Sequence, residues 1–264
     1  MSESAARFDG NIPDNYDRFL GPVIFEPYAR DETHSGDQVL EIACGTGIAA
    51  KLLRRSLLVS CDLTATDLSP AMLEIAKEQL GELPRLNWQQ ADAADRPFPA
   101  HSFSALACRF GYIFVHNKNA VFREARRVLS KGGVLMINLW DSMNINHFAR
   151  IAHDTVGSFF HSDPPGFYKI PFGFYELETI KNLLASNGFD QINLAITPLE
   201  VRSESAKSFA AGLVNGTPIS LAIQERELSR ESVVDAVAKR LGAVGGDRPF
   251  RSTMQAIVAT AIAV

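Results

Sequence analysis

One segment of this 264-residue chain gives the strongest indication of its fold: Val39-Leu-Glu-Ile-Ala-Cys-Gly-Thr-Gly47. Its first half is apolar apart from Glu41, which is typical of a buried strand. Its second half carries two glycines, and an amphipathic segment then runs to about Arg55. Glycines allow a tight turn and let a ligand approach the backbone closely. The stretch therefore predicts a strand, a ligand-binding loop and a helix, in that order.

Strand and helix signals continue to alternate on the C-terminal side of this stretch. Ser69 and Pro70 are typical of the cap and first position of a helix, which Gly81 would end. Asn117 would cap another helix, with Gly132-Gly133 as its stop. Further strands are expected at 57–66, 86–89, 103–108, 134–139, 191–196 and 254–264, and a helix at 177–186. This order predicts an α/β fold, a parallel sheet with helices on both faces.

Composition excludes several classes of protein. The chain is 46% hydrophobic and 21% charged, which predicts one sizeable core. Its net charge of −4 predicts no nucleic-acid partner. Cys44, Cys61 and Cys108 form no Cys-x-x-Cys motif, which argues against a zinc site or a disulfide framework. The longest apolar run, 256–264, is too short to span a membrane, and no signal peptide is recognisable at the start. We therefore expect a cytoplasmic protein with no membrane partner and no bound metal.

The glycine-rich loop alone is compatible with two kinds of ligand. The spacing Gly45-x-Gly47-x-x-Ala50 satisfies a loose form of the dinucleotide-binding pattern, and Asp67 falls about where a ribose-binding acid belongs. An NAD-dependent oxidoreductase is therefore one hypothesis.

Other acidic residues favour a cationic nucleoside ligand. Glu41 places a carboxylate two residues inside the strand end, which a cation tolerates and a pyrophosphate does not. Asp92, in Ala91-Asp92-Ala93, ends the third strand where it could read an adenine edge. The sequence also predicts no second domain that would hold a hydride acceptor.

These residues resemble the motifs of class I S-adenosylmethionine-dependent methyltransferases. Over nearly its whole length the chain is similar to the group that includes ubiquinone/menaquinone C-methyltransferases and many small-molecule enzymes. The matching segments are 15–19, 39–47, 65–72, 91–99, 108–111, 124–133 and 254–261. Ala43 replaces the usual first glycine of the family. The resemblance implies a Rossmann-like sheet of seven strands, mostly parallel with an antiparallel last strand, and S-adenosylmethionine as cofactor.

The resemblance also implies a cofactor site. Its residues would be Tyr16, Glu41, Ala43, Gly45, Thr46, Gly47, Asp67, Leu68, Met72, Asp92, Ala93, Arg109 and Phe110. The loop glycines would lie under the methionine part, with Glu41 supporting the loop or the cofactor's amino group. Asp67 would take the ribose hydroxyls, and Asp92 with the Ala93 backbone would read the adenine edge.

Other implied contacts complete that site. Leu68 and Met72 would lie against the adenine, and Tyr16 could close over the methionine end. Arg109 and Phe110 would border the sulfonium, although Arg109 departs from a more usual glutamine.

The remaining segments are expected to complete a single domain, 1–264. Residues 1–36 would form an N-terminal helical segment, 37–141 the cofactor-binding core, and 142–175 and 200–250 a helical lid over the acceptor. Seven aromatic residues lie between Phe159 and Tyr175. Either they pack the insertion onto the sheet, or Phe172 joins Tyr112, Trp140 and Phe110 in lining an acceptor pocket.

The expected reaction is methyl transfer to a small, planar or apolar molecule by direct displacement. Because a sulfonium is already a strong electrophile, alignment can suffice, and no catalytic residue is assigned. Four histidines lie on the acceptor side, His116, His147, His153 and His161, and His116 is the candidate base. A non-catalytic S-adenosylmethionine-binding module is the other alternative. The sequence leaves the oligomeric state open, with a homo-oligomer among the alternatives.

Overall fold

The computed structural model describes residues 12–25 and 38–264. The chain divides into two compact units, each of which is described by itself. The helical unit consists of Met1–Pro27, Asp141–Gly173 and Pro198–Gln255, and the sheet unit of Tyr28–Trp140, Phe174–Thr197 and Ala256–Val264.

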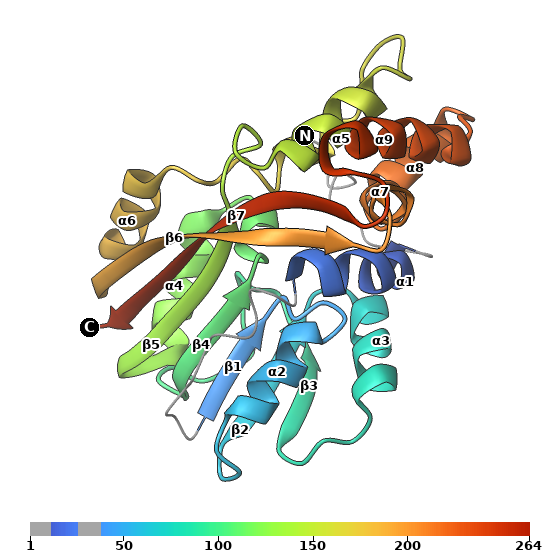
Figure 1. The fold of residues 1–264 in the computed structure, drawn as a ribbon. Helices are drawn as coiled ribbons and strands as arrows, with labels where there is room; N and C mark the ends of the chain where they lie inside the picture. Colours follow the sequence, from blue (N-terminus) through green and yellow to red (C-terminus); the bar gives the residue numbers. More distant parts are fainter. Residues whose placement is uncertain (1–11, 26–37) are drawn as a thin grey trace. The chain divides into compact units, whose positions relative to one another are not determined.

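Seven strands among the described residues form one sheet (Figure 1). They are β1 (Gln38–Ile42), β2 (Asp62–Asp67), β3 (Leu86–Gln90), β4 (Phe103–Arg109), β5 (Leu129–Trp140), β6 (Phe189–Ser203) and β7 (Phe250–Ala263). Their order is β3-β2-β1-β4-β5-β7-β6. Strands β1 to β5 pair in parallel, and β7 is antiparallel to β5. The expected Rossmann-like sheet with an antiparallel last strand is confirmed.

Helices cover both faces of the sheet unit. In Figure 1, α2 (Ile48–Ser56) lies in front of the sheet and α4 (Lys118–Val128) behind it, with α3 (Pro70–Leu80) beside β3 and α6 (Leu177–Ser186) near β6. The core between α2 and the sheet contains Val39, Leu53, Leu57, Cys61, Leu63, Ala105, Ala107 and Met136. Because Val39 and Ala107 belong to this cluster, strand alternation puts Glu41 and Arg109 on the same face as α2.

The boundary between α4 and β5 differs from the expectation. The helix ends at Val128 and the strand begins at Leu129, before the glycine pair that was expected to stop the helix. Leu129 is fully buried and pairs with Phe103, so burial of an apolar side chain overrides the glycine signal. Gly133 lets the irregular start of β5 pass close to β4, since a Cβ there would lie 3.1 Å from the Ser104 carbonyl oxygen.

The helical unit is built mainly from the N-terminal segment and the two insertions. Its helical elements are α1 (Ile12–Asn15), the π-helix η2 (Tyr16–Phe25), α5 (His147–Gly157), η5 (Phe167–Lys169), α7 (Ala206–Asn215), α8 (Ile219–Glu225) and α9 (Arg230–Gly245). Phe209 of α7 stacks on Phe250 and packs against Phe148 of α5. In the part of the chain that the structure describes, no helix has the length and apolar character needed to cross a membrane.

Candidate functional site

The loop after β1 follows an unusual backbone path. Ala43, Gly45 and Gly47 have φ values of 52°, 56° and 83°, all in the left-handed region. The Cys44 N–H donates to the Thr66 carbonyl oxygen, and the Gly47 N–H donates to that of Cys44, both at 3.0 Å. Ala43 therefore adopts a conformation that glycine accepts more readily, at a cost of about 1–2 kcal/mol.

The two glycines of this loop serve different purposes. A Cβ at Gly47 would lie 3.0 Å from the Ala76 Cβ and 3.1 Å from the ring of Trp88, so glycine is needed there for α3 and β3 to pack. A Cβ at Gly45 would meet nothing within 4 Å. The backbone at Gly45 is therefore open to a ligand.

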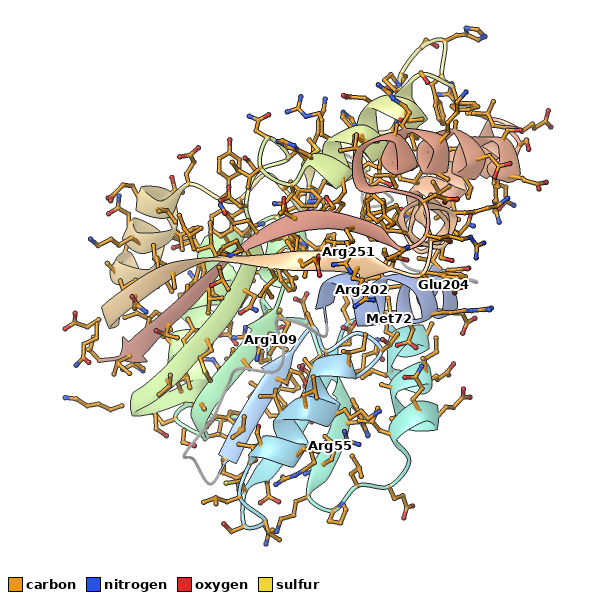
Figure 2. The ribbon with its side chains drawn as sticks, in the orientation of Figure 1. Arg55, Met72, Arg109, Arg202, Glu204 and Arg251 are labelled. Carbon is orange, nitrogen blue, oxygen red and sulfur yellow. The ribbon has the colours of Figure 1, made fainter. Side chains whose placement is uncertain are left out.

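Asp67 ties the loop to the start of α3. Its Oδ2 accepts a hydrogen bond from the Gly45 N–H and its Oδ1 accepts one from the Ser69 N–H, both at 2.8 Å. Burial raises the pKa of Asp67 above its usual value, although the backbone donors oppose this effect. Next to it, Leu68 exposes 63% of its surface, whereas Met72 of α3, which is labelled in Figure 2, is buried. An acid, an exposed apolar side chain and an open backbone thus lie together at the carboxyl end of β2.

Asp92 follows the end of β3, one strand beyond Asp67. Its Oδ1 accepts a hydrogen bond from the Ala94 N–H at 2.7 Å, and the side chain is exposed. The Ala91 N–H donates to the Asp67 carbonyl oxygen at 3.1 Å, which holds this segment against the end of β2. Asp67 and Asp92 therefore lie at the same edge of the sheet.

Glu41 lies inside the sheet unit, on the strand β1 that leads into the loop. It is 1% exposed and stands beside Ala65 of β2 and Ala107 of β4. Thr46 is also buried, and its hydroxyl has no hydrogen-bond partner among the described residues. Burying a carboxylate is costly, so the position of the Glu41 side chain favours a role at the site over simple packing.

The segment after β4 borders the same edge of the sheet. The guanidinium of Arg109, which is labelled in Figure 2, donates a hydrogen bond to the side chain of Asn138, its neighbour on β5. The Phe110 N–H donates to the Asn138 carbonyl oxygen at 2.9 Å. The Phe110 ring stacks on the Trp140 ring, with centroids 4.1 Å apart. An aromatic pair and a polar pair thus meet where β4 and β5 end.

The expected acceptor residues are divided between the units. Tyr112 is 1% exposed and stacks on Phe122 with centroids 4.7 Å apart, and its burial raises the pKa of the phenol. Trp140 is also buried in the sheet unit. Phe172 belongs to the helical unit, where it meets the edge of Phe148, and Tyr16 begins η2 in the same unit. A common pocket for these side chains remains a prediction.

Comparison with known proteins identifies the type of enzyme. Residues 40–137 match the family model of a methyltransferase domain. The chain is 29% identical over 172 residues to the ubiquinone/menaquinone biosynthesis C-methyltransferase UbiE of Pseudomonas putida strain F1, a match that covers 60% of this chain and 67% of that protein. Residues 40–137 thus carry a methyltransferase domain, and the protein is an S-adenosylmethionine-dependent methyltransferase.

A second curated relative supports the same conclusion, and solved structures share the fold. The UbiE protein of Xylella fastidiosa strain M23 is 34% identical over 108 residues, which covers 40% of this chain and 43% of that one. Among solved structures, YcgJ of Bacillus subtilis has a TM-score of 0.57 at 18% identity, over 90% of this chain and 95% of that chain. Phosphoethanolamine N-methyltransferase 2 of Haemonchus contortus, in complex with S-adenosyl-L-methionine, has a TM-score of 0.54 at 16% identity, over 95% and 52%.

The geometry of the methyltransferase fits its cofactor, S-adenosylmethionine. The left-handed loop, the open backbone at Gly45 and the acid at Asp67, here called the cradle, offer the backbone access and the carboxylate that binding of a nucleoside requires. The methyltransferase matches confirm the S-adenosylmethionine prediction over the NAD-dependent alternative.

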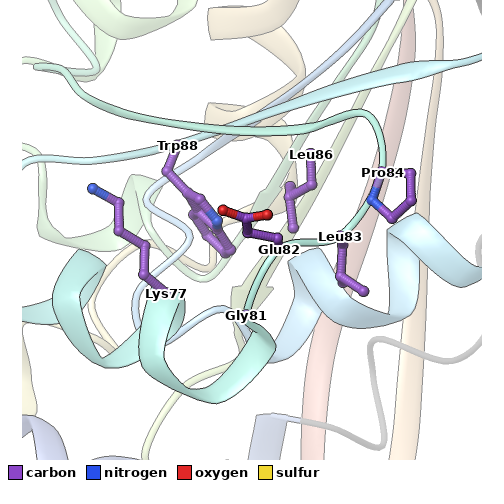
Figure 3. A pocket seen from close by; sticks show the side chains of 7 residues that line it. All are labelled: Lys77, Gly81, Glu82, Leu83, Pro84, Leu86 and Trp88. Atoms are coloured by element: carbon purple, nitrogen blue, oxygen red, sulfur yellow. The ribbon is translucent and has the colours of Figure 1, made fainter.

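The hollow shown in Figure 3 is distinct from this cradle. It has a volume of about 650 Å³ and is lined by Lys77, Gly81, Glu82, Leu83, Pro84, Leu86 and Trp88. These residues lie at the end of α3 and the amino end of β3, whereas the acids of the cradle lie at carboxyl ends of strands. The hollow therefore does not overlap the expected cofactor site.

The candidate base His116 is exposed in the turn before α4. Lys118, two residues later, was missed by the sequence reasoning. Its ammonium donates to the carbonyl oxygens of Ile113 and Val115, and burial lowers its pKa to about 8. The available signal was a lysine at the first position of a helix, directly after the cap residue Asn117, where a cation is unfavourable.

Proposed function

We propose that this methyltransferase passes its methyl group to a small, flat, largely apolar molecule by direct displacement. The observation that carries the proposal is the stacked pair Phe110 and Trp140 at the carboxyl ends of β4 and β5. Stacked rings offer a rigid apolar wall, and an aromatic acceptor would pack well against such a wall.

The relatives' names support this acceptor class. The curated relatives act in ubiquinone/menaquinone biosynthesis as C-methyltransferases. A ring that carries hydroxyl groups is a good carbon or oxygen nucleophile and is flat enough for an aromatic wall. We therefore favour a hydroxylated aromatic ring over a protein or nucleic-acid acceptor, in keeping with the net charge of −4.

In the proposed site the cofactor lies across the ends of β1, β2 and β3. The Gly45 and Gly47 backbone lies under its methionine part, Asp67 takes the ribose hydroxyls, and Asp92 reads the adenine edge. The exposed side chain of Leu68 supports this placement, because an apolar residue beside a ribose-binding acid can cover the adenine. Arg109 would stand near the sulfonium end.

The proposed reaction needs alignment more than proton transfer. A lone pair or π-electron pair of the acceptor attacks the methyl carbon, the carbon–sulfur bond breaks, and its electrons stay on sulfur to give S-adenosylhomocysteine. Any proton lost by the acceptor passes to water. The enzyme contributes orientation and a dry surface, which the buried aromatic pair can supply. His116 is not needed for this step.

The test is transfer of labelled methyl from S-adenosylmethionine into a cell extract, followed by separation by size. We expect label in the small-molecule fraction, and in 1,4-naphthoquinol when this ring is added as a defined probe. Label found only in protein or nucleic acid would overturn the acceptor class while leaving the cofactor assignment intact.

Aromatic variants test the acceptor wall. Trp140→Leu should raise the KM for the small-molecule acceptor while S-adenosylmethionine affinity changes much less, since the residues proposed to hold the nucleoside lie at the ends of β1, β2 and β3. Phe159→Leu is the control, because this partly exposed ring lies outside the proposed wall. Equal effects of Trp140→Leu and Phe159→Leu would remove Trp140 from the wall.

A further inference from the structure

The segment Phe110–Val115, here the post-β4 loop, is held in place from both ends. At its start, Phe110 has a φ of 59° and stacks on Trp140. The short helix η4 (Tyr112–Phe114) follows, and Tyr112 stacks on Phe122 of α4. The start of the loop therefore contributes to the edge where methyl transfer is proposed, and its end leads toward α4.

A single side chain fastens the end of the post-β4 loop. The Lys118 Nζ donates to the Ile113 carbonyl oxygen at 3.1 Å and also to the Val115 carbonyl oxygen. Carbonyls at the end of a helical turn have no partner within the turn. Lys118 supplies donors for both and closes the loop onto the start of α4.

The position of this lysine is unfavourable for the helix itself. Lys118 is the first residue of α4, where the helix dipole and the free N–H groups favour an anion. Asn117 caps this end by accepting a hydrogen bond from the Ala120 N–H at 3.0 Å. The contact with the loop carbonyls offsets this unfavourable placement of the cation.

The other contacts of Lys118 show which groups compensate its positive charge. The ammonium lies 5.3 Å from the centre of the Phe174 ring, in the segment that precedes α6. Among residues 12–25 and 38–264, no ion pair joins a carboxylate to it. The charge is therefore balanced by carbonyl dipoles and an aromatic face, and these contacts are directional.

We propose that Lys118 is a positioning residue for methyl transfer: by holding the Ile113 and Val115 carbonyls, it fixes the post-β4 loop and thereby the Phe110 ring beside the reacting atoms. It touches neither cofactor nor acceptor. The inference rests on the methyltransferase reaction and on the placement of Phe110 at the acceptor wall in the proposed function.

The test compares three variants in whole cell extract as the acceptor source, so that the result does not depend on the acceptor's class. Lys118→Met keeps the length of the side chain and removes its donors. Lys118→Arg keeps the charge and the donors. Arg123→Met removes a cation from the same helix at an exposed position and is the matched control.

We expect Lys118→Met to lower turnover or raise the apparent KM for the extract by about tenfold to a hundredfold, because small misplacements of reacting groups cost this much. The KM for S-adenosylmethionine should stay within about twofold. Lys118→Arg should recover most of the activity, and Arg123→Met should match the wild type.

Hydrogen exchange with S-adenosylhomocysteine bound provides a measurement that is independent of turnover. Peptides covering 110–117 should exchange faster in Lys118→Met alone, while peptides from β1 and β2 stay protected. Unchanged exchange in the loop, unchanged activity, or an equal rise in both KM values would each refute the positioning role.

Discussion

The methyl group of Ala43 occupies the space that a side chain at Gly111 would need. A Cβ built on Gly111 would lie 2.2 Å from the Ala43 Cβ and 2.9 Å from the Cys108 sulfur. The loop after β1 and the post-β4 loop are therefore in close contact at two small residues. The absence of a side chain at Gly111 makes room for the Ala43 methyl group.

This contact predicts an asymmetric pair of variants. Gly111→Ala should lower the free energy of unfolding by at least about 3 kcal/mol, the upper end of the usual cost of overpacking. Ala43→Gly should change it by no more than about 1 kcal/mol, because relief of the left-handed strain offsets the lost packing and the added chain entropy. The double variant should recover part of the loss, since the Cys108 sulfur still crowds the new methyl group. Urea unfolding measures all three, and a double variant as unstable as Gly111→Ala would contradict the direct contact.

The two glycines of the first loop should respond differently to alanine. Gly47→Ala should destabilise the fold by about 1–3 kcal/mol beyond backbone strain, because its Cβ would press on Ala76 and Trp88. Gly45→Ala adds only backbone strain of about 1–2 kcal/mol, but it should weaken S-adenosylhomocysteine binding at least tenfold, because its methyl group would enter the cradle. Calorimetric titration and urea unfolding separate the two effects. Full cofactor affinity in a folded Gly45→Ala variant would place the methionine part elsewhere.

The affinity for the cofactor should depend on the ionisation of Asp67. A ribose hydroxyl donates to a carboxylate, so protonation of Asp67 weakens binding as the pH falls. Because burial raises the pKa of Asp67, the loss should begin at a higher pH than the usual aspartate value of 3.8 would give. Asp67→Asn should weaken binding by about 1–3 kcal/mol and show less pH dependence. The measurement is S-adenosylhomocysteine affinity between pH 4 and 7, with circular dichroism to verify that the protein stays folded. An equally steep profile in Asp67→Asn would assign the titration to another group.

Stability should rise with pH in a range set by Lys118. Its pKa in the folded protein is lowered to about 8 from the ordinary 10.5, because burial disfavours the charged form. Between these values the unfolded chain holds the proton and the folded chain releases it, so the free energy of unfolding increases with pH. The free energy of unfolding of the wild type, relative to that of Lys118→Met, should therefore increase from pH 8 to pH 10. A constant difference in urea unfolding over this range would show that the lysine titrates normally.

The sheet, the glycine loop and the type of enzyme could be predicted from local signals in the sequence. Apolar runs bounded by Gly45, Asp67 and Asp92 are local signals, because the residues that form a strand and the turn after it are neighbours in the chain. Parallel strands bring their carboxyl ends to one edge, so these residues could be assigned to one site before any coordinates were known. The choice between cofactors also depended on residue types within short motifs.

Contacts between residues that lie far apart in the chain became visible only in the folded structure. The start of β5 was misjudged because pairing of Leu129 with Phe103 outweighs the local glycine signal. The fit of Ala43 against Gly111 joins loops that follow different strands. In the local sequence, Lys118 is a cation at an unfavourable helix position. The hydrogen bonds from its ammonium to the loop carbonyls are visible only in the folded structure. Such contacts depend on how strands and helices pack, and packing distances are a property of the whole chain, which no short segment encodes.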